Sequence, residues 1–202
     1  MVKGIDATQV VRQVDSSLSQ LTTAGQTLPI VPIAVNVSAV QLRQEGFCAL
    51  VREVLRKTGL QAEKLELEVT ESVLLSNVDV MHSVLQILKE MGVSLALDDF
   101  GTGFSSLSYL KQLRVNKLKI DRSFVRDLPQ DRDNAVITTA IINMAKILDL
   151  AVVAEGVETE AQLRFLRETG CNTVQGYHTG RPGLAEQMEM LLTSSPQPPE
   201  IA

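Results

Sequence analysis

The chain has 202 residues, a formal net charge of −5 and an apolar fraction of 45%. This acidic balance, without a stripe of basic residues, excludes a general binder of DNA or RNA backbone. No apolar run is long enough and free enough of charge to cross a membrane, because the best candidate, residues 135–154, contains Asn143, Lys146 and Asp149.

Short apolar stretches alternate along the chain with segments that have the apolar spacing of helices. Strands are expected at residues 33–35, 65–67, 93–97, 116–118, 151–154 and 172–174. Helices are expected at residues 7–24, 47–58, 78–91, 105–113, 135–148 and 160–169, with Gly59, Gly92 and Gly170 placed as C-terminal caps. This order predicts parallel strands joined by right-handed crossovers, so that every strand ends on the same side of the sheet.

Each expected strand is followed by a polar residue that could bind a metal ion or a substrate. These residues are Asn36, Glu68, Asp98, Lys119, Glu155 and Gln175. Because the strands end on one side, we expect the six side chains to converge, as they do on the catalytic rim of a (β/α) barrel. An open doubly wound sheet would instead spread them along a line.

The run Asp98-Asp99-Phe100-Gly101 is the strongest single motif, since it sets two adjacent carboxylates at the end of an apolar strand. Adjacent residues of an ideal strand point to opposite faces. The chain must therefore turn at Asp99 if both carboxylates are to share ions, and Gly101 and Gly103 provide backbone freedom for such a turn. By itself the motif is equally compatible with a turn at a strand end that caps the next helix.

The number of expected strands falls short of a complete barrel. Six strand-and-helix units are present, whereas a barrel needs eight strands. Since residues 7–24 have helical spacing, we expect the first strand and helix of the barrel to be missing. An open barrel exposes strand edges, which invites completion by another chain. The domain is expected to cover residues 1–193, and the proline- and serine-rich residues 194–202 to form a disordered tail.

The chain is expected to be located in the cytoplasm, either as a separate protein or as the cytoplasmic part of a larger sensor protein. Cys48 and Cys171 form no spaced motif and are most simply buried thiols in a reducing compartment. The first residues lack the apolar core of a signal peptide.

Taken together, the motifs resemble the EAL family, the cyclic di-GMP phosphodiesterase domains of bacterial signalling proteins. The matching stretches are VNVS at 35–38, LELEVTES at 65–72, DDFGTGFSSL at 98–107, LKIDRSF at 118–124, AEGVET at 154–159, QGY at 175–177 and GRP at 180–182. The resemblance implies a modified TIM-type (β/α)8 barrel that hydrolyses cyclic di-GMP to linear pGpG with Mg²⁺ or Mn²⁺. The family's Glu-Ala-Leu strand, whose glutamate binds metal, has no counterpart in this sequence.

Ligand chemistry and the resemblance together suggest roles for the residues of the rim. Hard divalent cations prefer oxygen ligands. We expect Asn36, Glu68 and Asp98 to bind a first ion, and Asp98, Asp99 and Glu155 a second. Lys119 would hold the attacking water or a phosphate oxygen, or act as a base after losing a proton.

Further residues are expected to assist catalysis or to support the site. Glu155 is expected to be catalytic besides binding metal, and Gln175 would orient water or substrate. The resemblance implies that Glu71 steadies the loop at residues 101–106. The expected substrate, loop and supporting residues are Glu71, Gly101, Thr102, Gly103, Phe104, Ser105, Asp121, Glu158 and Pro182.

Several structural interpretations of these residues stay open at the level of sequence. Lys119 and Asp121 could form a purely structural ion pair. Glu66 and Glu68 could be the solvated face of an edge strand. The acids at 155 and 158 could simply favour the dipole of the helix that follows.

Two other functions also stay open: a non-catalytic receptor for cyclic di-GMP or a protein partner, and an unrelated barrel enzyme that uses a divalent metal. The expected partners are cyclic di-GMP, other signalling domains in a longer parent protein, and a second copy of the chain. For a homodimer, the resemblance implies that residues 105–113 connect the site to the contact.

Overall fold

The computed structural model describes residues 31–71, 78–103, 110, 113 and 115–183. The expected helix at 7–24, most of the helix expected at 105–113 and the tail at 194–202 lie outside these residues. Among the described residues, no helix combines the length and apolar character that a membrane crossing requires.

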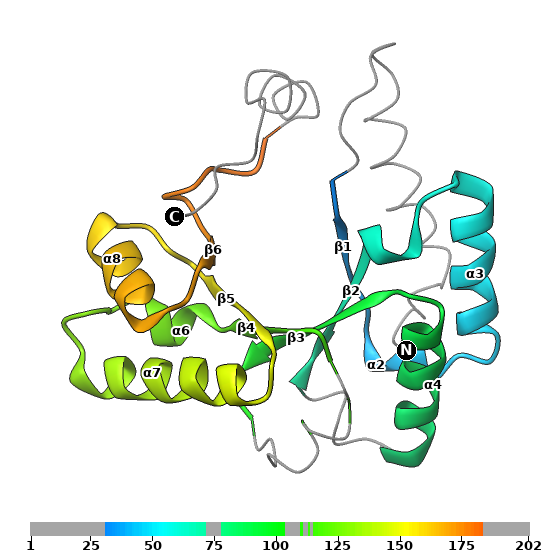
Figure 1. Ribbon diagram of the computed structural model, residues 1–202, viewed down its shortest axis with the longest axis horizontal. Helices are drawn as coiled ribbons and strands as arrows, with labels where there is room; N and C mark the ends of the chain where they lie inside the picture. Colours follow the sequence, from blue (N-terminus) through cyan, green and yellow to red (C-terminus); the bar gives the residue numbers. More distant parts are fainter. Residues whose placement is uncertain (1–30, 72–77, 104–109, 111–112, 114, 184–202) are drawn as a thin grey trace, which may run out of the picture.

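The centre of the molecule is a single sheet of parallel strands, hydrogen-bonded in the order in which they occur in the chain (Figure 1). Its six strands are β1 (Ile33–Asn36), β2 (Leu65–Thr70), β3 (Ser94–Phe100), β4 (Lys117–Ile120), β5 (Ala151–Glu155) and β6 (Thr173–Gln175). The sheet curls like part of a TIM-type barrel. All six strands predicted from the sequence are therefore present.

Helices cover the outer side of this curved sheet (Figure 1). The longer ones are α3 (Phe47–Thr58), α4 (Val78–Glu90), α7 (Arg132–Ile147) and α8 (Glu160–Thr169). Short helical segments are α2 (Ala39–Leu42), η1 (Ala62–Lys64) and α6 (Arg122–Val125). In Figure 1, α3 and α4 lie beside the β1 to β3 half, whereas α7 and α8 lie beside the β4 to β6 half.

The helix ends follow from local capping. Helix α8 stops where Gly170 adopts a left-handed φ of 89°, which allows Cys171 N to donate to Leu166 O at 2.8 Å. Helix α7 begins at Arg132, three residues before the expected start, because the Asp131 carboxylate accepts hydrogen bonds from the amides of Asp133 and Asn134. Apolar spacing alone could not detect this polar first turn.

The hydrophobic core lies between the outer face of the sheet and the helices. Leu65, Leu67, Leu95, Leu97 and Leu118 from the strands are fully buried. They pack in one cluster with helical side chains that include Val51, Leu85, Leu88, Ile142 and Leu166. Since successive strand residues point to opposite faces, the residues between these leucines face the inside of the curve. That alternation puts Glu66, Glu68, Ala96, Asp98 and Lys119 on one concave surface.

Close backbone packing beside β6 generates a stability prediction. A methyl group on Gly176 would collide with the backbone nitrogen and oxygen of Val157, in the loop that follows β5. We expect Gly176→Ala to lower the free energy of unfolding by about 1–3 kcal/mol, because backbone cannot yield as a flexible side chain does. Urea unfolding measures the change. Gly180→Ala is the control, since a methyl group there meets nothing within 4 Å. Equal stabilities of the two variants would contradict the prediction.

Candidate active site

The strand ends bring three of the predicted site residues into direct contact with a fourth, Lys119. Lys119 Nζ lies 3.0 Å from Glu68 Oε2, 3.0 Å from Asp98 Oδ1 and 2.6 Å from Glu155 Oε1. Lys119 is only 5% exposed, so these ion pairs lie largely out of water. One cation thus links carboxylates from β2, β3 and β5.

The pKa of Lys119 reflects this surrounding. Burial alone would lower the pKa, but the contacts with Glu155, Glu68 and Asp98 outweigh burial and raise the pKa above its ordinary value. Lys119 therefore carries its positive charge throughout the neutral pH range. This direction disfavours the base role that the sequence left open for Lys119.

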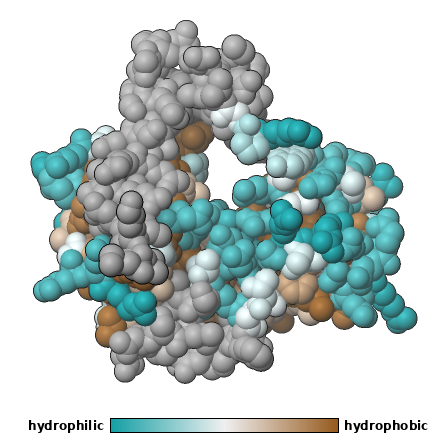
Figure 2. Space-filling view, turned by 180° about the vertical axis from the view of Figure 1, so that it is seen from behind, coloured by the Kyte–Doolittle hydropathy of each residue, from teal (hydrophilic) through white to brown (hydrophobic). Residues whose placement is uncertain are grey.

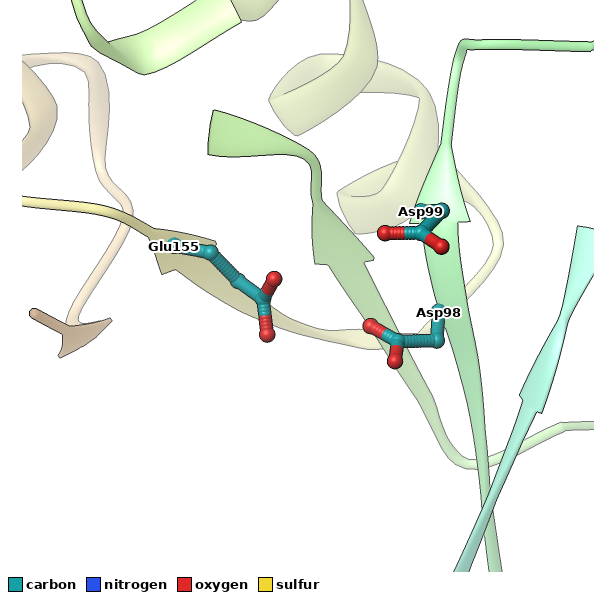
Figure 3. Close-up of side chains that lie close together, drawn as sticks. All are labelled: Asp98, Asp99 and Glu155. Atoms are coloured by element: carbon teal, nitrogen blue, oxygen red, sulfur yellow. The ribbon is translucent and has the colours of Figure 1, made fainter. Parts of the chain in front are cut away.

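A second cluster consists of Asp98, Asp99 and Glu155, whose carboxylates face one another across the ends of β3 and β5 (Figure 3). One carboxylate oxygen from each residue lies within 4.8 Å of the other two. The chain turns at Asp99, which has a left-handed φ of 55°, and the pairing of β3 with β4 shifts register between Leu97 and Phe100. This turn brings the carboxylates of two adjacent residues to one cluster.

The electrostatics of this cluster favour a bound cation. Burial, together with the negative charges of Asp98 and Asp121, raises the pKa of Asp99. Burial also raises the pKa of Glu155, and the hydrogen bond from Lys119 offsets only part of that effect. Apart from its ion pair with Lys119, buried Asp98 Oδ1 has no aligned hydrogen-bond partner among the described residues. Oxygen donors with excess negative charge and unused lone pairs fit a hard divalent ion.

Glu71 connects the end of β2 to the glycine loop that follows β3. Glu71 is buried, and its Oε2 accepts hydrogen bonds from Gly101 N at 3.1 Å and Gly103 N at 3.2 Å. A methyl group on Gly103 would lie 2.9 Å from Glu71 Oε1, so glycine allows this close approach. In the same turn, Thr102 Oγ1 donates to Asp99 O at 2.9 Å.

Of the other predicted site residues, Asn36 and Gln175 lie beside the cluster, and Asp121 interacts with Asp99 and adds to the rise in its pKa that burial causes. Asn36 is paired in register with Glu68, and Gln175 with Glu155, so both lie at the level of the cluster. Asp121 caps α6 by accepting from Ser123 N at 2.8 Å, while Glu158 is exposed. Pro182 is exposed near the end of the described residues, and Phe104 and Ser105 lie outside them.

One strongly interacting pair was missed at the level of sequence. Glu66 forms an ion pair with Lys117 at 2.6 Å, and β2 lies between β1 and β3 instead of at an edge. The solvated edge face considered for Glu66 and Glu68 is therefore wrong, since each residue is 8% exposed. The lysines two positions apart on β4, opposite two glutamates equally spaced on β2, were the available signal.

Comparisons with known proteins agree with this geometry. A sequence model of the family described as "EAL domain" matches residues 1–182. The chain is 49% identical over 156 residues to the bifunctional diguanylate cyclase/cyclic di-GMP phosphodiesterase MucR of Pseudomonas aeruginosa, covering 77% of this chain and 23% of that protein. It is 51% identical over 150 residues to the cyclic di-GMP phosphodiesterase NbdA of the same species, covering 74% and 19%. The chain thus spans about a fifth of the length of these curated relatives.

Solved structures give the same family. The MucR phosphodiesterase in complex with c-di-GMP superposes with a TM-score of 0.78 at 44% identity, covering 87% of this chain and 71% of that one. The EAL domain of Mycobacterium smegmatis DcpA superposes with a TM-score of 0.87 at 37% identity, covering 96% and 87%.

The Lys119 cluster generates a prediction about stability and pH. Lys119→Met leaves buried carboxylates without their cation, so we expect the free energy of unfolding at pH 7 to fall by about 3–5 kcal/mol. The loss should shrink as the pH falls toward about 5. Burial raises the pKa of Glu155 and the contact with Lys119 lowers it, so removing Lys119 raises that pKa further above its value in the unfolded chain. As the pH falls, the folded variant therefore binds a proton at Glu155 before the unfolded chain does, and this stabilises the variant.

Urea unfolding at several pH values measures this effect in the metal-free protein. Lys57→Met is the matched control, because Lys57 pairs with Glu53 at 3.4 Å while its side chain stays 66% exposed. An exposed pair contributes about 0–1 kcal/mol. Equal losses in both variants, or a loss in Lys119→Met that does not depend on pH, would contradict the prediction.

Proposed function

The chain belongs to the EAL domain family, and from this premise we propose that it hydrolyses one phosphodiester bond of cyclic di-GMP to linear pGpG. The observation that carries the proposal is the convergence of carboxylates at the carboxyl ends of the strands: Glu68, Asp98 and Glu155 contact Lys119, and Asp99 joins Asp98 and Glu155 in one cluster. The similarity to a phosphodiesterase solved with c-di-GMP supports the choice of substrate.

The proposed cofactor is a pair of Mg²⁺ or Mn²⁺ ions. Asp98, Asp99 and Glu155 would hold one ion, while Asn36 and Glu68 would join Asp98 in holding the other. Bound divalent ions lower the pKa of a coordinated water and stabilise negative charge on phosphoryl oxygens. The unused lone pairs of Asp98 Oδ1 and the raised pKa values of Asp99 and Glu155 support this assignment.

The protein's own groups would orient the reaction. Lys119 keeps its proton, so we assign it the role of a charged donor to the water or to a phosphate oxygen. It also balances the carboxylates that surround it. Glu155, which lies 2.6 Å from Lys119 Nζ, would take part in catalysis by positioning the water beside the ion that it helps to hold. Gln175, in register with Glu155, would orient the water or the substrate without changing the local charge.

The glycine loop would contact the substrate. Glu71 holds the amides of Gly101 and Gly103, and Thr102 closes the turn after Asp99. Roles for Asp121, Glu158 and Pro182 around this site stay predictions. A homodimer contact that involves residues 105–113 also stays a prediction, because most of that segment lies outside the described residues. We further propose that the domain acts in the cytoplasm beside other signalling domains, as the greater length of its relatives suggests.

Hydrolysis is tested by incubating the chain with cyclic di-GMP and Mn²⁺ and following linear pGpG by chromatography. We expect product that disappears with EDTA and returns with added Mn²⁺. Asp98→Asn should lower the rate about 100-fold or more, because it removes charge from the proposed ligand of both ions. Asp127→Asn is the control, as Asp127 pairs with Arg126 on the surface. Turnover without metal, or binding of cyclic di-GMP without any product, would contradict the proposal.

The contact of Glu71 with the loop generates a separate kinetic prediction. Glu71→Gln loses the charge that strengthens the hydrogen bonds from the two glycine amides, so we expect kcat to fall about ten-fold. The affinity for Mn²⁺ should change less than about three-fold, because Glu71 is not assigned as a ligand. Exposed Glu168→Gln serves as the control for both measurements. A parallel loss of Mn²⁺ affinity and kcat would place Glu71 among the ligands instead.

A further inference from the structure

A second ion pair, between half-buried Lys117 and buried Glu66, lies on the same concave surface as the candidate site. Lys117 Nζ lies 2.6 Å from Glu66 Oε2 and 2.9 Å from Glu66 Oε1, so it contacts both carboxylate oxygens. The Glu66 side chain is 10% exposed and that of Lys117 28% exposed. Ser94 Oγ also donates to Glu66 Oε2, at 3.4 Å. The function proposed above gives this pair no task.

The pair repeats the geometry of Glu68 and Lys119 one level further from the strand ends. Glu66 and Glu68 are two positions apart on β2, as are Lys117 and Lys119 on β4. Strand β3 lies between β2 and β4, so both ion pairs must bridge two strand spacings, roughly 10 Å. Small residues on β3 allow this, because Ser94 is in register with Glu66, and Ala96 with Glu68 and Lys117. The two lysines of β4 therefore meet the two glutamates of β2 above the small side chains of β3.

The two ion pairs share one hollow on the concave side. This hollow has a volume of about 330 Å³, and its lining includes Glu66, Glu68, Lys117 and Lys119. Residues two positions apart on a strand are separated by roughly 6.6 Å, a distance that the flexible four-carbon stem of a lysine can cover. Lys117 therefore has room to reach Glu68 when nothing else holds its ammonium.

We infer that Glu66 is a positioning residue, which holds Lys117 away from Glu68 so that Lys119, and not Lys117, contacts the carboxylates of the candidate site. The inference deepens the proposed function and rests on it where it concerns metal binding. Without Glu66, the half-buried Lys117 ammonium loses the carboxylate that it contacts. Glu68 is then the carboxylate within reach, and a second lysine on Glu68 competes with a divalent ion for the same oxygens.

Glu66→Met tests the inference in the metal-free protein, because methionine has a similar length and no oxygen to accept from Lys117. The readout is the set of nuclear Overhauser contacts from the ε protons of Lys117. We expect contacts with the γ protons of Glu66 in the wild type and of Glu68 in the variant. A Lys117 side chain that turns into solvent in Glu66→Met, without contact to Glu68, would overturn the inference.

Mn²⁺ affinity, followed by electron paramagnetic resonance of the free ion, gives the second readout. Glu66→Met should weaken binding about ten-fold or more, the range for residues that orient metal ligands. The double variant Glu66→Met/Lys117→Met should return to within about three-fold of the wild type, because it removes the competing lysine and leaves an apolar pair. A merely structural pair predicts no such rescue, and a double variant as weak as the single one would overturn the inference.

The two readouts separate this inference from the proposed function. A wild-type chain that binds no Mn²⁺ would contradict the metal site, while the proton contacts of Lys117 still decide the role of Glu66. If Glu66→Met does not fold, the double variant carries the test, since replacing both buried charges by apolar groups is often neutral for stability. It should keep the contacts between Lys119 and Glu68, and their loss would overturn the inference.

Discussion

The organisation of this protein depends on one buried ammonium group that contacts carboxylates from three strands. Lys119 projects from β4 between Asp98 of β3 and Glu155 of β5, and it also reaches Glu68 on β2. Negative groups this close repel one another strongly in a poorly solvated place. The single positive charge of Lys119 offsets only part of the repulsion between these carboxylates. The pKa values of Asp99 and Glu155 stay raised because of burial and the remaining negative charge. Carboxylates that keep an excess of negative charge in a partly buried place attract small, highly charged cations.

The same alternation of strand residues explains both the core and the site. Leucines at odd positions of β2 and β3 pack outward against α3 and α4, and the residues between them face the inside of the curve. Small residues such as Ala96 keep the concave surface low enough for glutamates and lysines on either side to meet. Packing on one face therefore fixes the positions of charged groups on the other, since a slip by one residue would exchange the two.

Much of this arrangement could be predicted from the sequence. Apolar runs ending in Asn36, Glu68, Asp98, Lys119, Glu155 and Gln175 predicted the strands, and glycines predicted the ends of α3 and α8. The ion-pair partners were harder to predict, because Asp121 is the acidic neighbour of Lys119 in the sequence whereas the actual partners lie 21 to 51 residues away. Register decides such partners, and a single sequence contains no register. The pair of Glu66 and Lys117 was missed as well, although the equal spacing of the glutamates and of the lysines along their strands was a signal for it.

Stability in the presence of a divalent ion tests most directly the claim that this carboxylate cluster binds a cation. Urea unfolding of the wild-type chain and of Asp98→Asn, each with EDTA or with 1 mM Mn²⁺, measures the coupling between binding and folding. An ion that binds only the folded state stabilises it by about 2.7 kcal/mol at a concentration 100 times its Kd. We predict that Mn²⁺ raises the free energy of unfolding of the wild type by an amount of this order and leaves that of Asp98→Asn nearly unchanged. A wild-type chain that Mn²⁺ does not stabilise, or an equal gain in both chains, would contradict the account.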